Sequence, residues 1–310
     1  MVENKYVNRV IVTDGEFLYN CATKRVLKNN AVETDIFNVI LFGILSKEKK
    51  IIIPEHLCGH KVQCISVQPY DKGKKFPDKI EKYSILPTLI NKSAHVYDIQ
   101  NYYYADSNYY IKANNYHATE YVVPESVSFI GSAFYHNTKI EKIYFKSSTS
   151  YIPHNCFSHC TSLKEIQLPS NLKSIRTNTF ENCLNLKCIA LPDSLIIISA
   201  GAFQYSGLEH IIIPKNVRTI NKETFINCSN LHTVILGTNT ERIYPNAFAN
   251  CFELRAIFIS PKVKSISKTA FANCNKLVIY STKNSYAQNY AYKHGIPFIA
   301  INKLPSLISN

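Results

Sequence analysis

Phenylalanine recurs at nearly fixed spacing from residue 134 onward, and this period constrains the fold more than any other feature of the chain. Successive copies are 23, 23, 23, 22, 23 and 23 residues apart, at Phe134, Phe157, Phe180, Phe203, Phe225, Phe248 and Phe271. A cysteine stands three residues after five of them, at Cys160, Cys183, Cys228, Cys251 and Cys274. A period of this length predicts a solenoid, in which each repeat buries its apolar side chains only against neighbouring repeats.

One repeat can be followed through residues 157–180. Leu163, Ile166 and Leu168 end in the in-and-out alternation of a short strand. Pro169 follows and ends the strand, because proline has no N–H group to donate to a sheet. Residues 172–175 form a second extended stretch that turns the chain back, and a tight turn or short helix around Phe180 closes the coil. Stacked coils then place equivalent strands side by side in one long parallel sheet.

The repeat pattern Ala-Phe-x-x-Cys-x-x-Leu-x-x-Ile-x-Leu-Pro closely resembles the BspA-like, or TpLRR-type, class of leucine-rich repeats. The best copies are residues 156–175, 179–198, 224–243 and 247–266. Residues 285–298 resemble the C-terminal cap of that family, a helix opened by Asn284 or Ser285 and stopped by Gly295. The resemblance implies an α/β repeat solenoid: a curved leucine-rich-repeat stack with a parallel sheet on one face, short helices or turns on the other, and a C-terminal helical cap.

One repeat is shorter than the others. Between Phe203 and Leu208 one residue is missing, and the cysteine position is lost with it. We therefore expect a local distortion of the stack at this coil.

The chain divides into five predicted segments. Residues 1–49 form an N-terminal cap or lead-in, and residues 50–96 form divergent repeats. Residues 97–121 form a tyrosine-rich hairpin insertion, whose rings either pack on the solenoid or stack on nucleic-acid bases. Residues 122–281 form the leucine-rich repeats, and residues 282–310 form the C-terminal cap.

The sequence favours a cytoplasmic protein. Its longest apolar stretch, residues 36–45, has half the length of a membrane-spanning helix, which needs about twenty residues. The N-terminus lacks the basic-then-apolar shape of a secretory signal. Cysteines that recur in one position per coil predict buried, reduced thiols rather than a disulfide framework. Many proteins of the resembled family lie on cell surfaces, so a surface or secreted location by a non-classical route is the alternative.

The net charge of +13 is spread along the chain without a run of like charges. Lys173, Arg218 and Lys264 nevertheless occupy one repeat position in three coils. Aligned in a stack, they predict a broken basic edge suited to polyanions or an acidic partner. The alternative is that these side chains are solvated and only keep a sheet protein soluble.

Two His/Cys clusters have the residue types of a zinc site: residues 56–64, with His56, Cys58, His60 and Cys64, and residues 154–160, with His154, Cys156, His159 and Cys160. In the second cluster the repeat register directs the cysteines inward and the histidines outward, so we predict no metal there. The first cluster is less constrained by the register and remains an alternative. No Gly-rich phosphate loop, Gly-x-Ser-x-Gly nucleophile elbow, His-Glu-x-x-His motif or pair of carboxylates at a catalytic spacing occurs. We expect no cofactor and no enzymatic activity.

The outward face of the predicted sheet carries the strongest functional signal. The column about ten residues after each Phe reads Tyr144, Gln167, Ala190, Ile212, Ile235 and Phe258, and the column two residues earlier includes Glu165 and His210. The face becomes apolar toward the C-terminus, and contiguous apolar surface marks partner sites. The alternatives are that such residues simply suit strands, or that the N-terminal region or the tyrosine-rich hairpin covers them.

We therefore predict a non-enzymatic module for protein–protein recognition. The resemblance implies a role in adhesion or host interaction for some members of the family. The predicted partner-binding residues are Tyr144, Glu165, Gln167, His210, Ile212, Ile235 and Phe258, and the alternative function is polyanion or nucleic-acid binding through the basic edge. The repeat pattern specifies neither the partner nor an oligomeric state.

Overall fold

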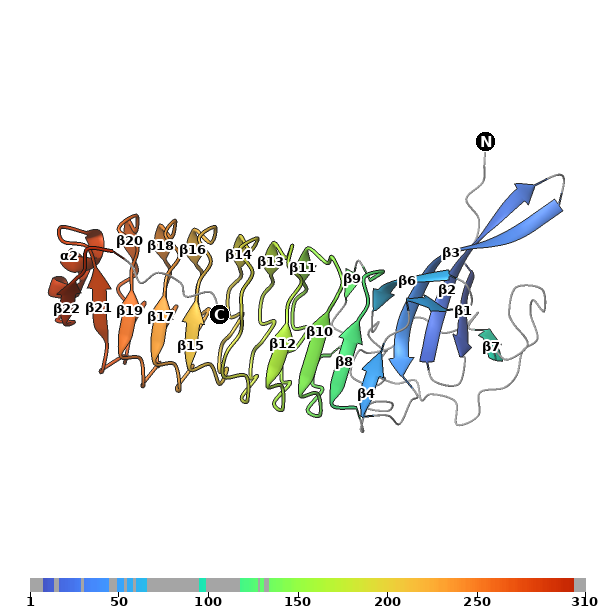
Figure 1. Cartoon of the computed structure of the whole chain (residues 1–310), viewed down its shortest axis with the longest axis horizontal. Helices are drawn as coiled ribbons and strands as arrows, with labels where there is room; N and C mark the ends of the chain where they lie inside the picture. Colours follow the sequence, from blue (N-terminus) through green and yellow to red (C-terminus); the bar gives the residue numbers. More distant parts are fainter. Residues whose placement is uncertain are drawn as a thin grey trace.

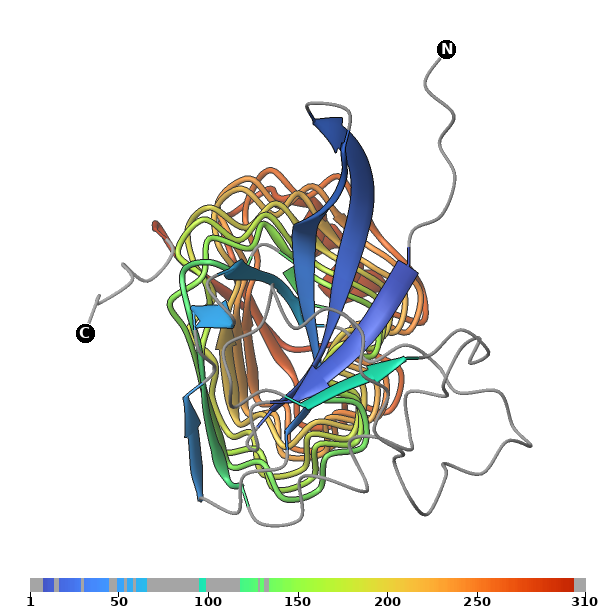
Figure 2. The ribbon, with the colours of Figure 1, turned by 90° about the vertical axis from the view of Figure 1, so that its right-hand side faces the viewer.

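The coils stack along one axis into an elongated solenoid (Figure 1). This computed structural model describes residues 8–13, 17–28, 31–44, 49–52, 55–57, 60–65, 95–98, 118–127, 129–130 and 134–303. Each regular coil contributes one strand to a front sheet and a second short strand to a back ladder, and turns join the two. Viewed along the axis, successive coils superimpose in outline (Figure 2). The predicted repeat solenoid is confirmed.

The front of the solenoid consists of two parallel sheets. The N-terminal front sheet contains β4 (Lys50–Ile52), β8 (Glu120–Val123), β10 (Lys142–Phe145) and β12 (Glu165–Gln167). The C-terminal front sheet contains β15 (His210–Ile212), β17 (Thr233–Ile235), β19 (Ala256–Phe258), β21 (Val278–Ser281) and β22 (Phe298–Ala300).

The back ladder is also divided in two. One part pairs β11 (Tyr151–Ile152), β13 (Ser174–Ile175) and β14 (Ile197–Ile198). The other pairs β16 (Thr219–Ile220), β18 (Arg242–Ile243) and β20 (Ser265–Ile266).

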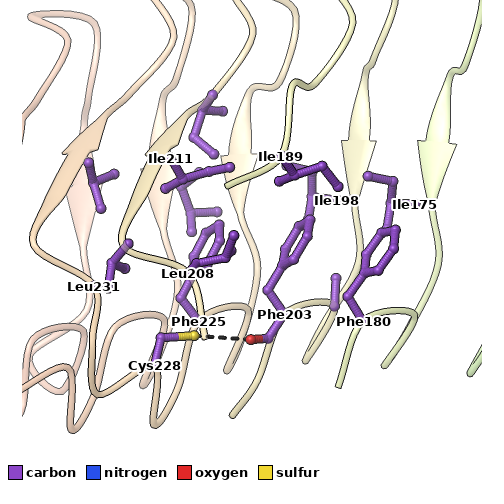
Figure 3. Packing of buried hydrophobic residues seen from close by; sticks show 14 of the residues in the cluster. Ile175, Phe180, Ile189, Ile198, Phe203, Leu208, Ile211, Phe225, Cys228 and Leu231 are labelled. Carbon is purple, nitrogen blue, oxygen red and sulfur yellow. Dashed lines mark hydrogen bonds between the residues drawn. The ribbon is translucent and has the colours of Figure 1, made fainter. Parts of the chain in front are cut away.

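The seven periodic phenylalanines form a continuous spine through the core. Neighbouring rings lie nearly parallel, with centroids 5.2–5.4 Å apart from Phe134 to Phe271. Figure 3 shows the central part of this spine, with Ile198 and Ile211 packed beside it. Because each ring contacts the ring of the next coil, burial requires neighbouring repeats, as a solenoid predicts.

The cysteines of the repeat run alongside the phenylalanine spine. Each buried thiol donates to the carbonyl oxygen of a Phe in the preceding coil, for example Cys183 to Phe157 at 3.2 Å and Cys228 to Phe203 at 3.0 Å (Figure 3). Burial raises the pKa of Cys228 to about 11 and raises that of Cys183 further. The five ladder cysteines are buried and unpaired by disulfides, which confirms their predicted environment.

The turns around each Phe explain a second regularity of the sequence. Residues two before and two after Phe180, Asn178 and Asn182, have φ values of 55°, and most equivalent positions are also left-handed. Asparagine is the side chain that tolerates this region best after glycine. The described coils therefore close by turns, and their only described helix is the C-terminal one.

The shorter repeat interrupts both sheets, as expected. Residues 187–190 form no strand between β12 and β15, and β14 does not pair with β16. The missing residue brings Gly207 against the preceding coil, where its N–H donates to the Cys183 carbonyl oxygen at 3.0 Å. A Cβ atom at Gly207 would lie 1.9 Å from the Leu184 carbonyl oxygen, so only glycine fits this close approach.

Strands precede the regular coils. β1 (Asn8–Thr13), β2 (Phe17–Lys28) and β3 (Ala31–Ile44) are antiparallel, and β7 (His95–Asp98) pairs with β1. β6 (His60–Ile65) pairs with β3, with β5 (His56–Leu57) and with β9 (Phe129–Ile130), while β4 extends the front sheet. The tyrosine-rich hairpin, at residues 102–112, lies outside the described residues, and the five segment boundaries stay predictions.

The C-terminal end is closed by α2 (Tyr286–Lys293), as the tail pattern predicts. Ser285 is the N-cap, and its hydroxyl accepts the Gln288 N–H at 3.2 Å. Tyr290 meets the last ring of the spine, Phe271, edge-on at 6.0 Å. The helix therefore covers the apolar end of the stack that the final coil leaves open.

Candidate functional site

Outward side chains alternate with core side chains in β10, β12, β15, β17, β19 and β21. In β12, Glu165 and Gln167 are exposed around the buried Ile166, and in β15, His210 and Ile212 are exposed around the buried Ile211. Parallel pairing places equivalent residues of neighbouring strands next to each other. The two outward columns of the sequence pattern are therefore real columns on the surface.

The N-terminal front sheet carries a polar network. Lys142 lies 3.5 Å from Glu165, Lys164 lies 3.0 Å from Glu141, and the Tyr144 hydroxyl donates to Glu165 Oε1 at 3.2 Å. Burial and then this hydrogen bond raise the pKa of Tyr144. Exposed pairs of this kind contribute at most about 1 kcal/mol each. The charges of this face are thus matched internally, while its second outward column aligns Ile52, which is 62 % exposed, with Val122 and Tyr144.

The C-terminal front sheet carries an apolar stripe, which we define as Ile212, Ile235, Phe258, Tyr280 and Ile299. Strand register aligns these five residues one per strand from β15 to β22. Ile212 is 43 % exposed and Ile299 is 46 % exposed, and the three residues between them are half-buried. The rings of Phe258 and Tyr280 stack with centroids 4.7 Å apart.

A second outward column borders the apolar stripe. It contains His210, Thr233, Ala256 and Val278, which the strand register also aligns. Only the His210 end is strongly polar, and its ring lies 5.9 Å from that of His232. Small and β-branched side chains thus extend the apolar surface across the width of the strands.

The structure separates the predicted partner-binding residues into two groups. Ile212, Ile235 and Phe258 lie together in the apolar stripe, with His210 at its border. The other group, Tyr144, Glu165 and Gln167, lies in the N-terminal front sheet, beyond the strand-free residues 187–190. The two groups therefore belong to different sheets, and their contact with a partner stays a prediction.

Tyr280, Val278 and Ile299 extend the surface but were not expected from the repeat. The last coil is one residue shorter between Leu277 and the outward positions, so a count of ten from Phe271 falls on Ser281, which is buried. Aligning the apolar Val-Ile-Tyr of residues 278–280 with Ala-Ile-Phe of residues 256–258 would have found the stripe's continuation.

The predicted basic edge is interrupted by Glu241. This residue occupies the same position in the coil between Arg218 and Lys264, at 2.7 Å from Arg218 and 4.0 Å from Lys264. Ile196, 48 % exposed, stands in the same position between Lys173 and Arg218. Two of the three predicted cations are thus adjacent to one carboxylate, and their binding of a polyanion stays a prediction.

The His/Cys clusters provide no metal site in the part of the chain that is described. There, no three His, Cys, Asp or Glu side chains are grouped so that they could hold a metal ion. Cys156 and Cys160 are buried in the core whereas His154 is exposed, so the second cluster does not converge. In the first cluster, the backbones of His56 and His60 lie in β5 and β6, and Cys58 lies outside the described residues.

The fold and its surface define a repeat protein with the architecture of a binding module. The sequence profile described as "BspA type Leucine rich repeat region (6 copies)" matches residues 90–209, 151–278 and 196–302, more than half of the chain. The chain belongs to the BspA-type leucine-rich repeat family. A comparison with curated proteins finds no significant match.

One of the similar solved structures supports the same fold. The leucine-rich repeat protein TpLRR of T. pallidum is 18 % identical over 90 % of this chain and 97 % of its own, with a TM-score of 0.51. A leucine-rich cell surface protein of Faecalibacterium prausnitzii is 17 % identical over 94 % of this chain and 95 % of its own, with a TM-score of 0.40. Within the described residues, no helix has the length and apolar character needed to cross a membrane.

Proposed function

We propose that the apolar stripe is the docking surface for another protein and that the chain acts by recognition rather than catalysis. The stripe itself is the observation that carries this proposal. Five large apolar side chains, one per strand, remain partly exposed across adjacent strands. Contiguous apolar surface of this kind on a soluble protein typically serves a partner.

The contrast between the two front sheets supports this assignment. Strand formation alone would explain β-branched residues, but the N-terminal front sheet forms the same strands with Lys142, Glu165 and Gln167 outward. Apolar outward residues also occur in the N-terminal front sheet, where Ile52, Val122 and Tyr144 share one column. The C-terminal front sheet differs because its column stays apolar on all five strands, whereas the N-terminal column ends at Gln167.

The apolar stripe also offers the features of an interface core. Phe258 and Tyr280 form a stacked aromatic pair at its centre, and aromatic residues contribute disproportionately to binding energy. The charged rim at Glu209, whose pKa is lowered by the hydrogen bond from Lys187, lies at one edge of the surface. An apolar centre with a polar rim is the usual arrangement of protein interfaces.

Site-specific photo-crosslinking in the source cells tests the proposal. A photoreactive phenylalanine analogue replaces Thr233 beside the stripe, or Ser229 on the turn face of the same coil as the control. We expect a protein adduct from position 233 and none from position 229. Equal adducts from both positions, or no adduct from 233, would contradict the proposal.

The identity of the adduct also decides between the two biological settings. A host or matrix protein would place this surface in adhesion, as the family resemblance favours. An intracellular protein would place it in a cytoplasmic assembly instead. The polyanion alternative has no comparable support, because Glu241 lies against Arg218 and Lys264.

A further inference from the structure

Acidic residues disappear from the C-terminal end of the chain. Glu253 is the last Asp or Glu in the sequence, and residues 254–310 contain eight Lys or Arg. Three stripe residues, Phe258, Tyr280 and Ile299, lie in this acid-free segment. A partner on the stripe therefore meets a strongly one-sided electrostatic environment.

The positive charge lies along one edge of the C-terminal front sheet. Lys215, Lys262 and Lys283 follow the C-terminal ends of β15, β19 and β21 within four residues, and all three are exposed. We call these three lysines the lysine edge. None of them forms an ion pair among the described residues, and Lys262 Nζ donates only to Asn239 Oδ1, at 2.7 Å.

The cations at the opposite edge of the same sheet are all paired with carboxylates. Arg255 and Lys276 both pair with Glu253, and Lys187 pairs with Glu209 at 3.1 Å. On this side of the apolar stripe three cations share two carboxylates, whereas the lysine edge on the other side carries three ammonium groups without an ion pair in the described part of the chain. This asymmetry fits a partner with carboxylates on one side of its apolar side chains.

The chemistry of the stripe distinguishes between anionic partners. Three of its five members are isoleucines, which offer bases no stacking surface. The two rings, Phe258 and Tyr280, already stack on each other at 4.7 Å, so no base fits between them. A second copy of this chain carries the same net charge of +13, which opposes self-association. Aliphatic contacts favour polypeptide side chains.

We propose that the partner is an acidic polypeptide, which places its apolar side chains on the stripe and its carboxylates on the lysine edge. This inference rests on the proposed docking surface and names the chemistry of its partner. The contacts at the edge are exposed, so they supply selectivity and salt dependence, while the stripe supplies the apolar attraction.

Fluorescence anisotropy with labelled synthetic polypeptides tests the inference on the full chain at neutral pH. The probe is a random copolymer of glutamate and tyrosine, compared with polyglutamate of equal length. We expect the copolymer to bind about tenfold more tightly, because its tyrosines use the stripe. The variant Phe258→Thr, which keeps a strand-forming residue, should remove that advantage and leave polyglutamate binding unchanged.

Two double variants separate the lysine edge from general charge. Lys262→Glu with Lys283→Glu should weaken copolymer binding about tenfold at low salt and flatten its salt dependence. Lys173→Glu with Lys268→Glu changes the net charge equally, at exposed positions outside the stripe, and should leave binding nearly unchanged. Equal losses in both double variants, or equal binding of copolymer and polyglutamate, would overturn the inference.

Competition completes the test. The competitors are heparin, an oligo-thymidine strand and phosphatidylserine vesicles. If one of them displaces the copolymer at a concentration of anionic groups lower than that of the copolymer itself, the surface binds another class of anion and the proposal is overturned. The proposed docking surface is tested separately, because the absence of a cross-link at position 233 would refute it. A cross-linked partner without carboxylates at its contact segment refutes the acidic partner alone.

Discussion

Ionisation of Cys228 should make the stability of the coil stack depend on pH. Its buried thiol donates to the Phe203 carbonyl oxygen at 3.0 Å and lies 3.3 Å from Ser206 Oγ. Burial raises its pKa to about 11, whereas an unfolded cysteine has a pKa of about 8.5. Because the folded-state pKa is higher, the unfolded state loses its proton first as the pH rises.

The magnitude follows from the two pKa values. The contribution of the thiol is complete below about pH 8.5 and declines until the folded-state pKa is reached. One pKa unit corresponds to about 1.4 kcal/mol, so by pH 10 the free energy of unfolding falls by about 2 kcal/mol from this thiol alone. Cys160 and Cys183 act in the same direction, because burial raises their pKa as well.

Urea denaturation of the reduced protein between pH 7 and pH 10 measures this effect, with Cys228→Ala as the comparison. The variant loses packing at every pH, so the informative quantity is the slope of stability against pH. Above about pH 9 the wild-type slope should be steeper than the variant's by about 1.4 kcal/mol per pH unit. Equal slopes of stability against pH for the two proteins would refute the conclusion that Cys228 is a buried, protonated thiol in the folded state.

Three further substitutions test the surface, the spine and the short coil. Ile235→Glu should lower stability by less than about 1 kcal/mol in a thermal melt while abolishing the cross-linked adduct, whereas the same change at the buried Val234 should unfold the chain. Phe203→Ala should cost about 3–5 kcal/mol in urea denaturation, because the ring is fully buried between two others; a cost below about 1 kcal/mol would argue against the spine. Gly207→Ala should cost about 1–3 kcal/mol in urea denaturation through its clash with the Leu184 carbonyl oxygen, whereas Gly295→Ala meets no atom within 4 Å and should cost about 1–2 kcal/mol through its left-handed φ of 65° alone.

The coil was predictable because its determinants are local and repeated. The Phe and Cys positions mark core side chains of the regular coils, and Pro124, Pro169, Pro214 and Pro261 mark where β8, β12, β15 and β19 end. The C-terminal helix was predictable for the same reason, since Ser285 and Gly295 bracket it in sequence. Each of these features depends on contacts within one repeat or with the next.

Features that depend on strand register or on charges in neighbouring coils were harder to predict from the sequence. One deletion before Val278 concealed the end of the apolar stripe, because a fixed count from Phe271 ends at a buried serine. The position of Glu241 between two predicted cations follows from the same column, but its neutralising effect appears only once the side-chain distances are known. The His/Cys cluster of residues 154–160 illustrates the converse, since Cys156 and Cys160 are buried whereas His154 is exposed, and residue types alone did not bring these side chains together.

At the short repeat, the front sheet and the back ladder are interrupted at different places along the solenoid. On the back of the solenoid, the Phe180 coil is bonded to the preceding coil, because its β14 pairs with β13. On the front, it is bonded to the following coil, because Glu209 N donates to the Lys187 carbonyl oxygen at 2.8 Å. The phenylalanine rings pass through this coil without interruption. The turn face also stays bonded through this coil, from Phe180 N to the Ala202 carbonyl oxygen at 2.8 Å and from Phe203 N to the Thr224 carbonyl oxygen at 2.9 Å. The core and the turns therefore hold the stack together at the short repeat, so that the loss of one residue interrupts the two sheets without dividing the solenoid.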